Sequence, residues 1–171
     1  MDERHHILTG LPGLDNVEEA TLAALARCFE LRSYTKVELC REGDPADRLW
    51  VLGAGQVSVS RQLSSRRPCE VAILRPTTLV GFSGLMGITN RSATLQAAGT
   101  IDVLEMTTED AVNLLDQEGS RVASAFRRVV IAAVGRQVST SNANIAKLAV
   151  EVGLATPVIT EEDLLAAQTL H

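Results

Sequence analysis

Three glycines and one arginine lie close together in residues 81–94, which read GFSGLMGITNRSAT. Gly81, Gly84 and Gly87 allow the main chain to approach a ligand closely and to point successive N–H groups into one concavity. A helical turn following them would add a partial positive charge. Arg91 carries a planar fork of donors that matches a phosphate. These residue types at this spacing predict a site for a single anionic group, and phosphate is the first ligand to consider.

The composition is that of one folded domain. The chain has 171 residues, of which 46% are apolar and 22% are charged, enough to build a core. A net charge of −5 argues against a nucleic-acid binder, which usually carries clustered positive charge. The start, MDERHH, leads into no apolar segment, and no apolar run is long enough to span a bilayer. We therefore expect a cytoplasmic protein with no membrane segment and no direct DNA binding.

The residues that most often carry catalysis or bind metals are few and scattered. Cys28, Cys40 and Cys69 are an odd number with no short spacing, which favours reduced thiols packed in the core over a disulfide or zinc site. The adjacent pair His5 and His6 is expected to be solvated at the N-terminus. No Ser/His/Asp or metal-ligand grouping is visible. We expect no catalytic residue, no metal and no cofactor, and hence no enzyme.

The elements that must position the glycines and Arg91 are predicted to be short strands. Residues 33–104 alternate between apolar and polar in short segments that Gly, Pro, Asp and Ser separate. The four clearest strands are residues 48–52, 56–60, 70–74 and 92–97. Residues 42–45, EGDP, supply a turn. Short strands at this spacing indicate an antiparallel barrel or sandwich.

Helices are expected on both sides of this sheet region. A short amphipathic helix should follow the turn at residues 11–13, with Asp15 or Asn16 as its cap and an apolar stripe that ends at Phe29. A second helix should begin at a threonine cap, Thr107 or the next residue, because two acids occupy its first turn. A short capped helix is also expected near Thr160.

The longest helix is predicted from Ser120 to about Leu148, with a broad apolar stripe and five basic residues but no acid. One interpretation is a core helix whose arginines snorkel to solvent. The other is a helix that extends past its own domain and pairs with a second copy of itself. We favour the homodimer, because Ala132, Ala133 and Gly135 permit close approach.

Three segments together resemble a known family. They are the turn at residues 41–47 (REGDPAD), the strand at residues 49–52 (LWVL) that leads to residues 55–59 (GQVSV), and Gly81 followed by Arg91-Ser92-Ala93-Thr94. They resemble the cyclic nucleotide-binding domain of catabolite-activator-type regulators and of the regulatory subunit of cAMP-dependent protein kinase. The order of elements extends the resemblance over residues 10–148. The remaining residues, 149–171, would be a short tail too small for a DNA-binding domain.

The resemblance implies a fold and a set of site residues. The fold would be α+β, an antiparallel β-roll, or jelly roll, of about eight strands flanked by an N-terminal helix and a long C-terminal helix. The family's phosphate-binding cassette lies between two of the strands, and its main chain would meet the ligand here at Gly81, Ser83 and Gly84. Arg91 would pair with the cyclic phosphate, and Ser92 would add a hydroxyl hydrogen bond. The long helix would cover the purine and form the dimer. The implied ligand-binding residues are Gly81, Phe82, Ser83, Gly84, Leu85, Arg91, Ser92 and Ala93.

One residue departs from the family pattern. The family cassette reads Gly-Glu-Leu-Ala/Gly-Leu, and its glutamate accepts a hydrogen bond from the ribose 2′-OH, whereas Phe82 occupies that position here. Loss of a charged acceptor costs roughly 1.5–3 kcal/mol, or about ten-fold to over a hundred-fold in affinity. One interpretation is a ligand sensor that binds cyclic nucleotides weakly or takes another phosphate-bearing anion.

The other interpretation is a degenerate cassette. Phe82 would then fill the pocket, Arg91 would bond to the backbone or to a nearby acid, and the domain would be a homodimeric interaction module with an unknown protein partner. We favour the sensor, because the cassette glycines and Arg91 are both present.

Overall fold

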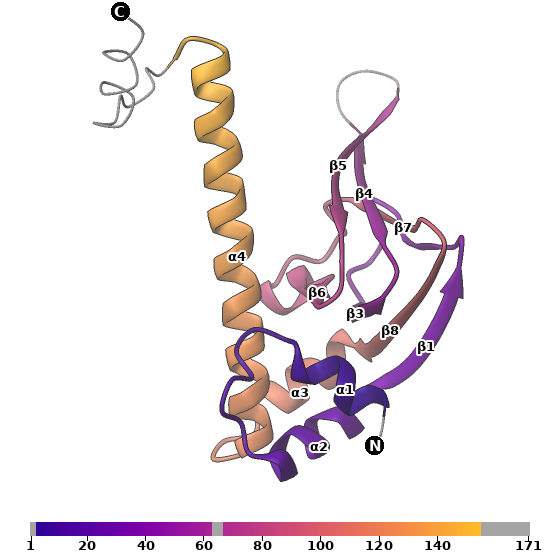
Figure 1. Ribbon diagram of the computed structural model, residues 1–171, viewed down its shortest axis with the longest axis vertical. Helices are drawn as coiled ribbons and strands as arrows, with labels where there is room; N and C mark the ends of the chain where they lie inside the picture. The colour runs from indigo at the N-terminus through magenta and orange to yellow at the C-terminus, as the bar shows by residue number, and fades with distance from the viewer. Residues whose placement is uncertain (1–2, 63–66, 155–171) are drawn as a thin grey trace, which may run out of the picture. The chain divides into compact units, whose positions relative to one another are not determined.

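The computed structural model describes residues 3–62 and 67–154 (Figure 1). Residues up to Ala133 form one compact unit, and residues from Val134 onward belong to a second. The strands of the first unit form two antiparallel four-stranded sheets, with the orders β1-β8-β3-β6 and β2-β7-β4-β5. This arrangement confirms the predicted α+β fold built on an antiparallel β-roll.

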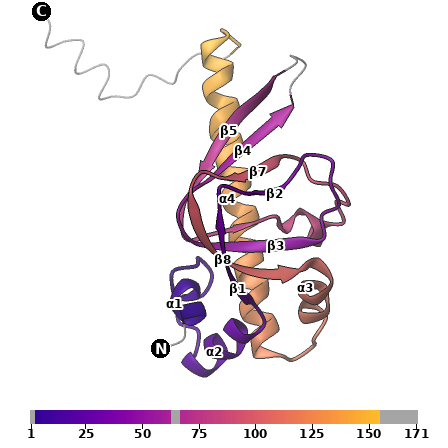
Figure 2. The same cartoon turned by 90° about the vertical axis from the view of Figure 1, so that its right-hand side faces the viewer.

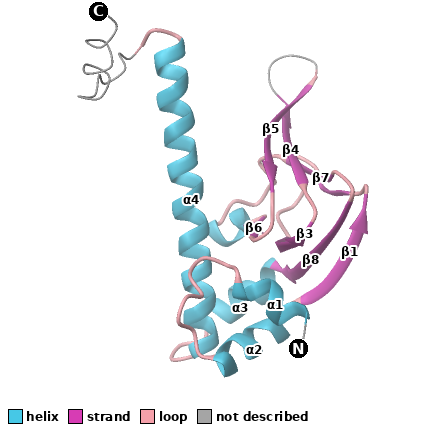
Figure 3. Cartoon of the chain, in the orientation of Figure 1, coloured by secondary structure: helices cyan, strands magenta, loops and turns pink. Residues whose placement is uncertain are grey.

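The strands are β1 (Glu30–Thr35), β2 (Glu38–Cys40), β3 (Arg48–Ala54), β4 (Val57–Gln62), β5 (Pro68–Leu74), β6 (Thr78–Val80), β7 (Thr94–Ala97) and β8 (Thr100–Thr107). The helices are α1 (Glu3–Thr9), α2 (Glu19–Arg27), α3 (Thr108–Leu115) and α4 (Arg121–Glu151), with a short 3-10 helix η1 (Phe82–Met86) between β6 and β7. Figure 3 shows how helices and strands are distributed along the chain. Among the described residues, none of these helices combines the length and apolarity needed to cross a bilayer.

The core of the first unit follows from alternation along β3 and β8, because successive side chains of a strand point to opposite faces. Trp50, Leu52 and Val103 belong to an apolar cluster to which both sheets contribute. Leu49 and Leu104 are also fully buried and point to the opposite face of their sheet. In Figure 2, helices α1, α2 and α3 lie at the same end of this unit as β8 and β1. The central parts of β3 and β8 are therefore buried on both faces, whereas β1 at the edge of the same sheet is largely exposed.

Two helix predictions hold and one needs correction. The side chain of Thr107 caps α3 by accepting a hydrogen bond from the Asp110 N–H at 3.0 Å, as predicted. The long helix is also present as α4. By contrast, α2 begins at Glu19 without a side-chain cap, so the caps predicted at Asp15 and Asn16 were wrong. Asn16 instead adopts a left-handed conformation, φ 61°, within the loop that precedes the helix.

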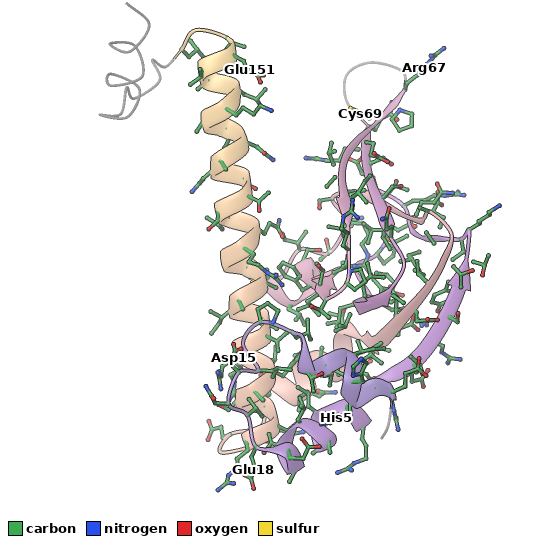
Figure 4. The ribbon with its side chains drawn as sticks, in the orientation of Figure 1. His5, Asp15, Glu18, Arg67, Cys69 and Glu151 are labelled. Carbon is green, nitrogen blue, oxygen red and sulfur yellow. The ribbon has the colours of Figure 1, made fainter. Side chains whose placement is uncertain are left out.

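The sequence interpretation missed α1 and, with it, the environment of one histidine. His5 lies on α1 and is 7% exposed, so the expectation of a solvated pair was wrong for this residue (labelled in Figure 4). Its Nε2 lies 2.9 Å from the Glu19 carboxylate of α2, although not in hydrogen-bonding geometry.

The three cysteines differ in burial. Cys40 is buried as predicted, whereas Cys28 and Cys69 are exposed, so the prediction was wrong for these two. Burial raises the pKa of the Cys40 thiol.

The remaining predictions concern the C-terminal part of the chain. The helix expected near Thr160 lies outside the described residues, as does most of the tail predicted for residues 149–171. The boundary of the domain at residue 148 stays a prediction.

Candidate anion-binding site

The cassette lies between β6 and β7 and consists of η1 with a left-handed glycine at each end, Gly81 at φ 77° and Gly87 at φ 75°. Gly81 and Gly84 approach other parts of the protein closely. A Cβ at Gly81 would lie 2.9 Å from Arg91 Nη1, and one at Gly84 would lie 2.5 Å from the Ala46 carbonyl oxygen. A Cβ at Gly87 would meet nothing within 4 Å. Packing therefore requires glycine at the first two positions, and backbone conformation alone favours it at the third.

Four hydrogen bonds hold residues 89–91, which follow the cassette, against residues 43–46 of the predicted turn and its end. The Gly43 N–H donates to the Arg91 carbonyl at 2.9 Å, and the Arg91 N–H donates to the Asp44 carbonyl at 2.7 Å. The Ala46 N–H donates to the Thr89 carbonyl at 2.8 Å, and Asn90 Nδ2 donates to the Gly43 carbonyl at 2.6 Å. Two of the three segments that carried the resemblance, the turn and the segment with Arg91, are thus joined by hydrogen bonds that fix the main chain of Arg91.

The side chain of Arg91 is buried, and the residue as a whole is 4% exposed. Its Nη1 donates to the Gly81 carbonyl at 2.9 Å, and its Nη2 donates to the Arg48 carbonyl at 2.6 Å. Its Cζ lies 4.9 Å from the centroid of the Trp50 ring, a cation–π contact. The Asp47 carboxylate is 3.7 Å from Nη2. Nε is buried and has no hydrogen-bond partner in the part of the chain that the structure describes.

The other residues predicted to contact a ligand differ in their exposure to solvent. Gly81, Phe82, Ser83, Gly84 and Leu85 are half-buried along η1. On the far side of Arg91, Ser92 is exposed and Ala93 is half-buried. The cassette thus brings the predicted residues into one segment around a buried guanidinium, and their roles toward a ligand stay predictions.

A buried carboxylate, which the sequence interpretation did not single out, lies behind Trp50. Glu105 of β8 is 6% exposed; its Oε2 accepts hydrogen bonds from Trp50 Nε1 at 2.8 Å and from the Tyr34 hydroxyl at 2.9 Å, and its Oε1 accepts one from the Arg48 guanidinium. Burial raises its pKa, but these hydrogen bonds and the charge of Arg48 together hold the pKa of the carboxyl below its ordinary value. Glu105 is therefore held as an anion.

A cavity of about 190 Å³ opens beside this carboxylate. Its walls are Tyr34, Val37, Glu38, Leu39, Arg48, Trp50 and Glu105, all from strands β1, β2, β3 and β8 or the turn between β1 and β2. None of the predicted cassette residues lines it.

A sequence signal for this cluster did exist. Glu105 is the only acid in the run VLEM of a strand that is otherwise apolar at that point, and buried carboxylates are almost always paired. Trp50 is the only tryptophan of the chain. The register that places these two residues opposite each other on β3 and β8 is a property of the folded sheet, so the sequence could not reveal the pair.

Comparisons with known proteins agree with this fold. The family model of the cyclic nucleotide-binding domain matches residues 32–118. A cyclic nucleotide-gated potassium channel from Mesorhizobium japonicum is 27% identical over 126 residues, which are 73% of this chain and 33% of the channel. The chain therefore spans about a third of the length of this relative.

Solved structures give the same fold. The catabolite activator protein of Thermus thermophilus is similar with a TM-score of 0.69 and 20% identity, over 82% of this chain and 64% of that protein. A cyclic nucleotide-binding domain from Methylobacillus flagellatus is similar with a TM-score of 0.73 and 15% identity, over 92% and 85%.

The chain belongs to the cyclic nucleotide-binding domain family, as the cassette and the turn at residues 42–45 had indicated. The family match and the shared fold support a regulatory module of this type.

Proposed function

We propose that this domain is a non-enzymatic sensor for a small phosphate-bearing anion, and that Arg91 pairs with the anionic group. Cyclic AMP and cyclic GMP would bind weakly, or would give way to another phosphate-bearing molecule, because Phe82 occupies the position of the ribose-binding glutamate. The anion would be met by cassette main chain at Gly81, Ser83 and Gly84 and by the exposed hydroxyl of Ser92. The role needs no metal and no cofactor.

One observation carries the proposal: Arg91 is a buried cation whose Nε–H lacks a hydrogen-bond partner among the described residues. An unpaired donor on a buried charged group is costly. The nearest carboxylate, that of Asp47, is 3.7 Å from Nη2 and 69% exposed, so it screens the guanidinium only weakly. An anion that reaches this edge of the guanidinium would satisfy the donor and compensate the charge.

Titration calorimetry tests the proposal with cAMP, cGMP and inorganic phosphate as separate ligands. We expect binding of at least one of them by the wild type, with the cyclic nucleotides weaker than micromolar. Phe82→Glu should increase affinity for the cyclic nucleotides by about ten-fold to a hundred-fold, because it supplies a charged acceptor for the ribose. Leu85→Glu is the matched control, since it adds the same charge to η1 away from the family position.

Two results would contradict specific parts of this proposal. Micromolar or tighter binding of cAMP by the wild type would remove the argument about Phe82. If neither the wild type nor Phe82→Glu gives binding heat with any of these ligands, the sensor function is excluded.

A second candidate function rests on the way Arg91 is bonded. Both of its Nη groups donate to main-chain carbonyls, which is the arrangement expected if the cassette has become structural. The domain would then be a homodimeric interaction module that binds a protein partner rather than a nucleotide. Failure of all the titrations would favour this function.

In either case we propose that α4 forms a homodimer. Exposed apolar residues recur on this helix and just past its end at seven-residue intervals, at Ile131, Val138, Ile145 and Val152, and Leu148 follows Ile145 by three. Their exposures range from 53% to 70%. A seam with this heptad period and β-branched residues at one position is typical of helices that pair in a coiled coil. A second copy of the same helix would cover it.

Equilibrium sedimentation tests the dimer directly. We expect the mass of a dimer at micromolar concentration. A species that stays monomeric at high micromolar concentration would exclude the pairing.

A further inference from the structure

The Trp50 indole contacts two charged groups at once. Its ring face lies against the Arg91 guanidinium, with Cζ 4.9 Å from the ring centroid. Its Nε1–H donates to Glu105 Oε2 at 2.8 Å. Trp50 is only 3% exposed, so water does not compete for either contact. The ring is therefore fixed at one edge by a carboxylate while its face carries the cation of the cassette.

The same residues are also connected through Arg48. The Arg48 carbonyl accepts a hydrogen bond from Arg91 Nη2 at 2.6 Å, and the Arg48 guanidinium pairs with Glu105. Trp50 and Glu105 are directly paired residues of β3 and β8. Arg91, Trp50, Glu105 and Arg48 thus form a closed loop of contacts that connects the cassette to the centre of one sheet.

We propose that Trp50 and Glu105 are positioning residues for Arg91: they hold the guanidinium in the orientation in which it receives an anion. This inference rests on the proposed function, namely that an anion binds at Arg91. A hydrogen bond from the indole N–H to a carboxylate polarises the ring and strengthens its attraction for a cation. Glu105 therefore acts on Arg91 through Trp50 without touching it.

The orientation of the guanidinium matters because an anion must compete for its donors. Nη1 and Nη2 already donate to carbonyls of the protein, and Nε has no hydrogen-bond partner in the described part of the chain. When the guanidinium changes partners, the contact with the Trp50 ring keeps its central carbon in place, because a cation–π attraction is not directed along any one N–H. Without this support the side chain would lose its preorganisation, and affinity would fall.

Glu105→Gln is the central variant, because it keeps the shape of the side chain and removes the charge. Trp50→Phe is the second variant, because it keeps an aromatic face and removes the N–H donor. Thr107→Ala serves as the control: it removes the cap of α3 and so reduces stability without a contact to Trp50 or Arg91 in the bonds described above. All variants are compared at equal folded fraction, measured by thermal melting.

The first readout needs no ligand. The hydrogen-exchange rate of the Arg91 Nε–H, measured by ¹⁵N NMR, reports how firmly the guanidinium is held. We expect exchange about ten-fold faster in Glu105→Gln and in Trp50→Phe than in the wild type, as for a site that opens more often, and unchanged exchange in Thr107→Ala. Equal exchange in the wild type and both variants would overturn the proposal.

The second readout is the affinity for cAMP, cGMP and inorganic phosphate, followed by Trp50 emission in the wild type and by calorimetry in all variants. We expect Glu105→Gln to weaken anion binding about ten-fold, comparable to the loss of one charge-assisted hydrogen bond, and Thr107→Ala to leave it unchanged. Equal affinities of wild type and Glu105→Gln would refute a positioning role. If the wild type binds none of these ligands, the sensor function fails, and the exchange rates still decide whether Trp50 and Glu105 position Arg91.

Discussion

Substitution of Gly81 by alanine tests whether the cassette is built around Arg91. The residue has φ 77°, so any side chain there costs about 1–2 kcal/mol of left-handed strain. The new Cβ would also lie 2.9 Å from Arg91 Nη1, 3.0 Å from Trp50 Cζ3 and 3.1 Å from the Arg48 carbonyl oxygen. Because the Arg91 side chain is buried and held by two carbonyls, it cannot move away without losing those bonds.

The matched control is Gly87→Ala at the other end of η1. Gly87 has nearly the same conformation, φ 75°, and a Cβ there meets nothing within 4 Å. It therefore costs the same left-handed strain of about 1–2 kcal/mol. Gly81→Ala should cost a further 1.5–3 kcal/mol, roughly one hydrogen bond of a charged group. The difference between the two variants isolates the contact with Arg91 from the strain of the backbone.

Urea denaturation followed by Trp50 fluorescence and by circular dichroism measures both changes in the free energy of unfolding. We expect Gly81→Ala to be the less stable variant and to shift the emission of folded Trp50, since the ring loses the cation on its face. Gly87→Ala should keep the wild-type emission. Equal destabilisation by the two substitutions, with unchanged emission in both, would refute the reasoning that Arg91 is held between Gly81 and Trp50.

Three further predictions concern other parts of the chain. The folded-state pKa of Glu105 is lowered, so its ionised form stabilises the protein above the unfolded pKa of about 4.3, and this contribution disappears as the pH falls through the folded pKa. Urea denaturation is measured between pH 6 and pH 3, about the range of a carboxylate titration. As the pH falls, the free energy of unfolding should decrease more steeply in the wild type than in Glu105→Gln. Parallel curves would contradict the stabilising role of ionised Glu105. Thr107→Ala should reduce the free energy of unfolding by about 1 kcal/mol, and a change below 0.3 kcal/mol, about the error of such measurements, would mean that the cap of α3 is not formed in solution. Ile145→Asp should convert the dimer to a monomer in sedimentation, because it places a charge in the apolar seam, whereas Asn142→Asp on the same helix should not; a dimer that survives Ile145→Asp would exclude this seam.

The fold could be predicted because its signals are local. The alternation of apolar and polar residues requires strands, and the EGDP turn of residues 42–45 and the glycines of residues 81–87 mark where the chain reverses or leaves the sheet. Such patterns depend on neighbours in sequence, which explains why the roll and α4 were predicted correctly. The start of α2 was placed too early because Asp15 and Asn16 are good caps locally, whereas the left-handed turn at Asn16 moves the first helical residue to Glu19.

The residues of the site also differ in whether local sequence patterns could indicate them. The cassette glycines and Arg91 could be predicted as a candidate site from the sequence because their types and spacing suit an anion, and their role toward a ligand stays a prediction. Tyr34, Arg48 and Glu105 could not, because they are separated by up to 71 residues along the chain and meet only through the pairing of β1, β3 and β8.

The sequence by itself determined the architecture, the position of the cassette and the presence of Phe82 where the family pattern has glutamate, since each of these is a matter of residue type and local order. Only the tertiary structure decided what the Arg91 guanidinium contacts. Its two carbonyl acceptors and the Trp50 ring come from β3 and from the start of the cassette, and sheet pairing brings these groups together. The physical reason is that side-chain chemistry is fixed by the residue, whereas burial and partners are fixed by packing between segments distant in sequence.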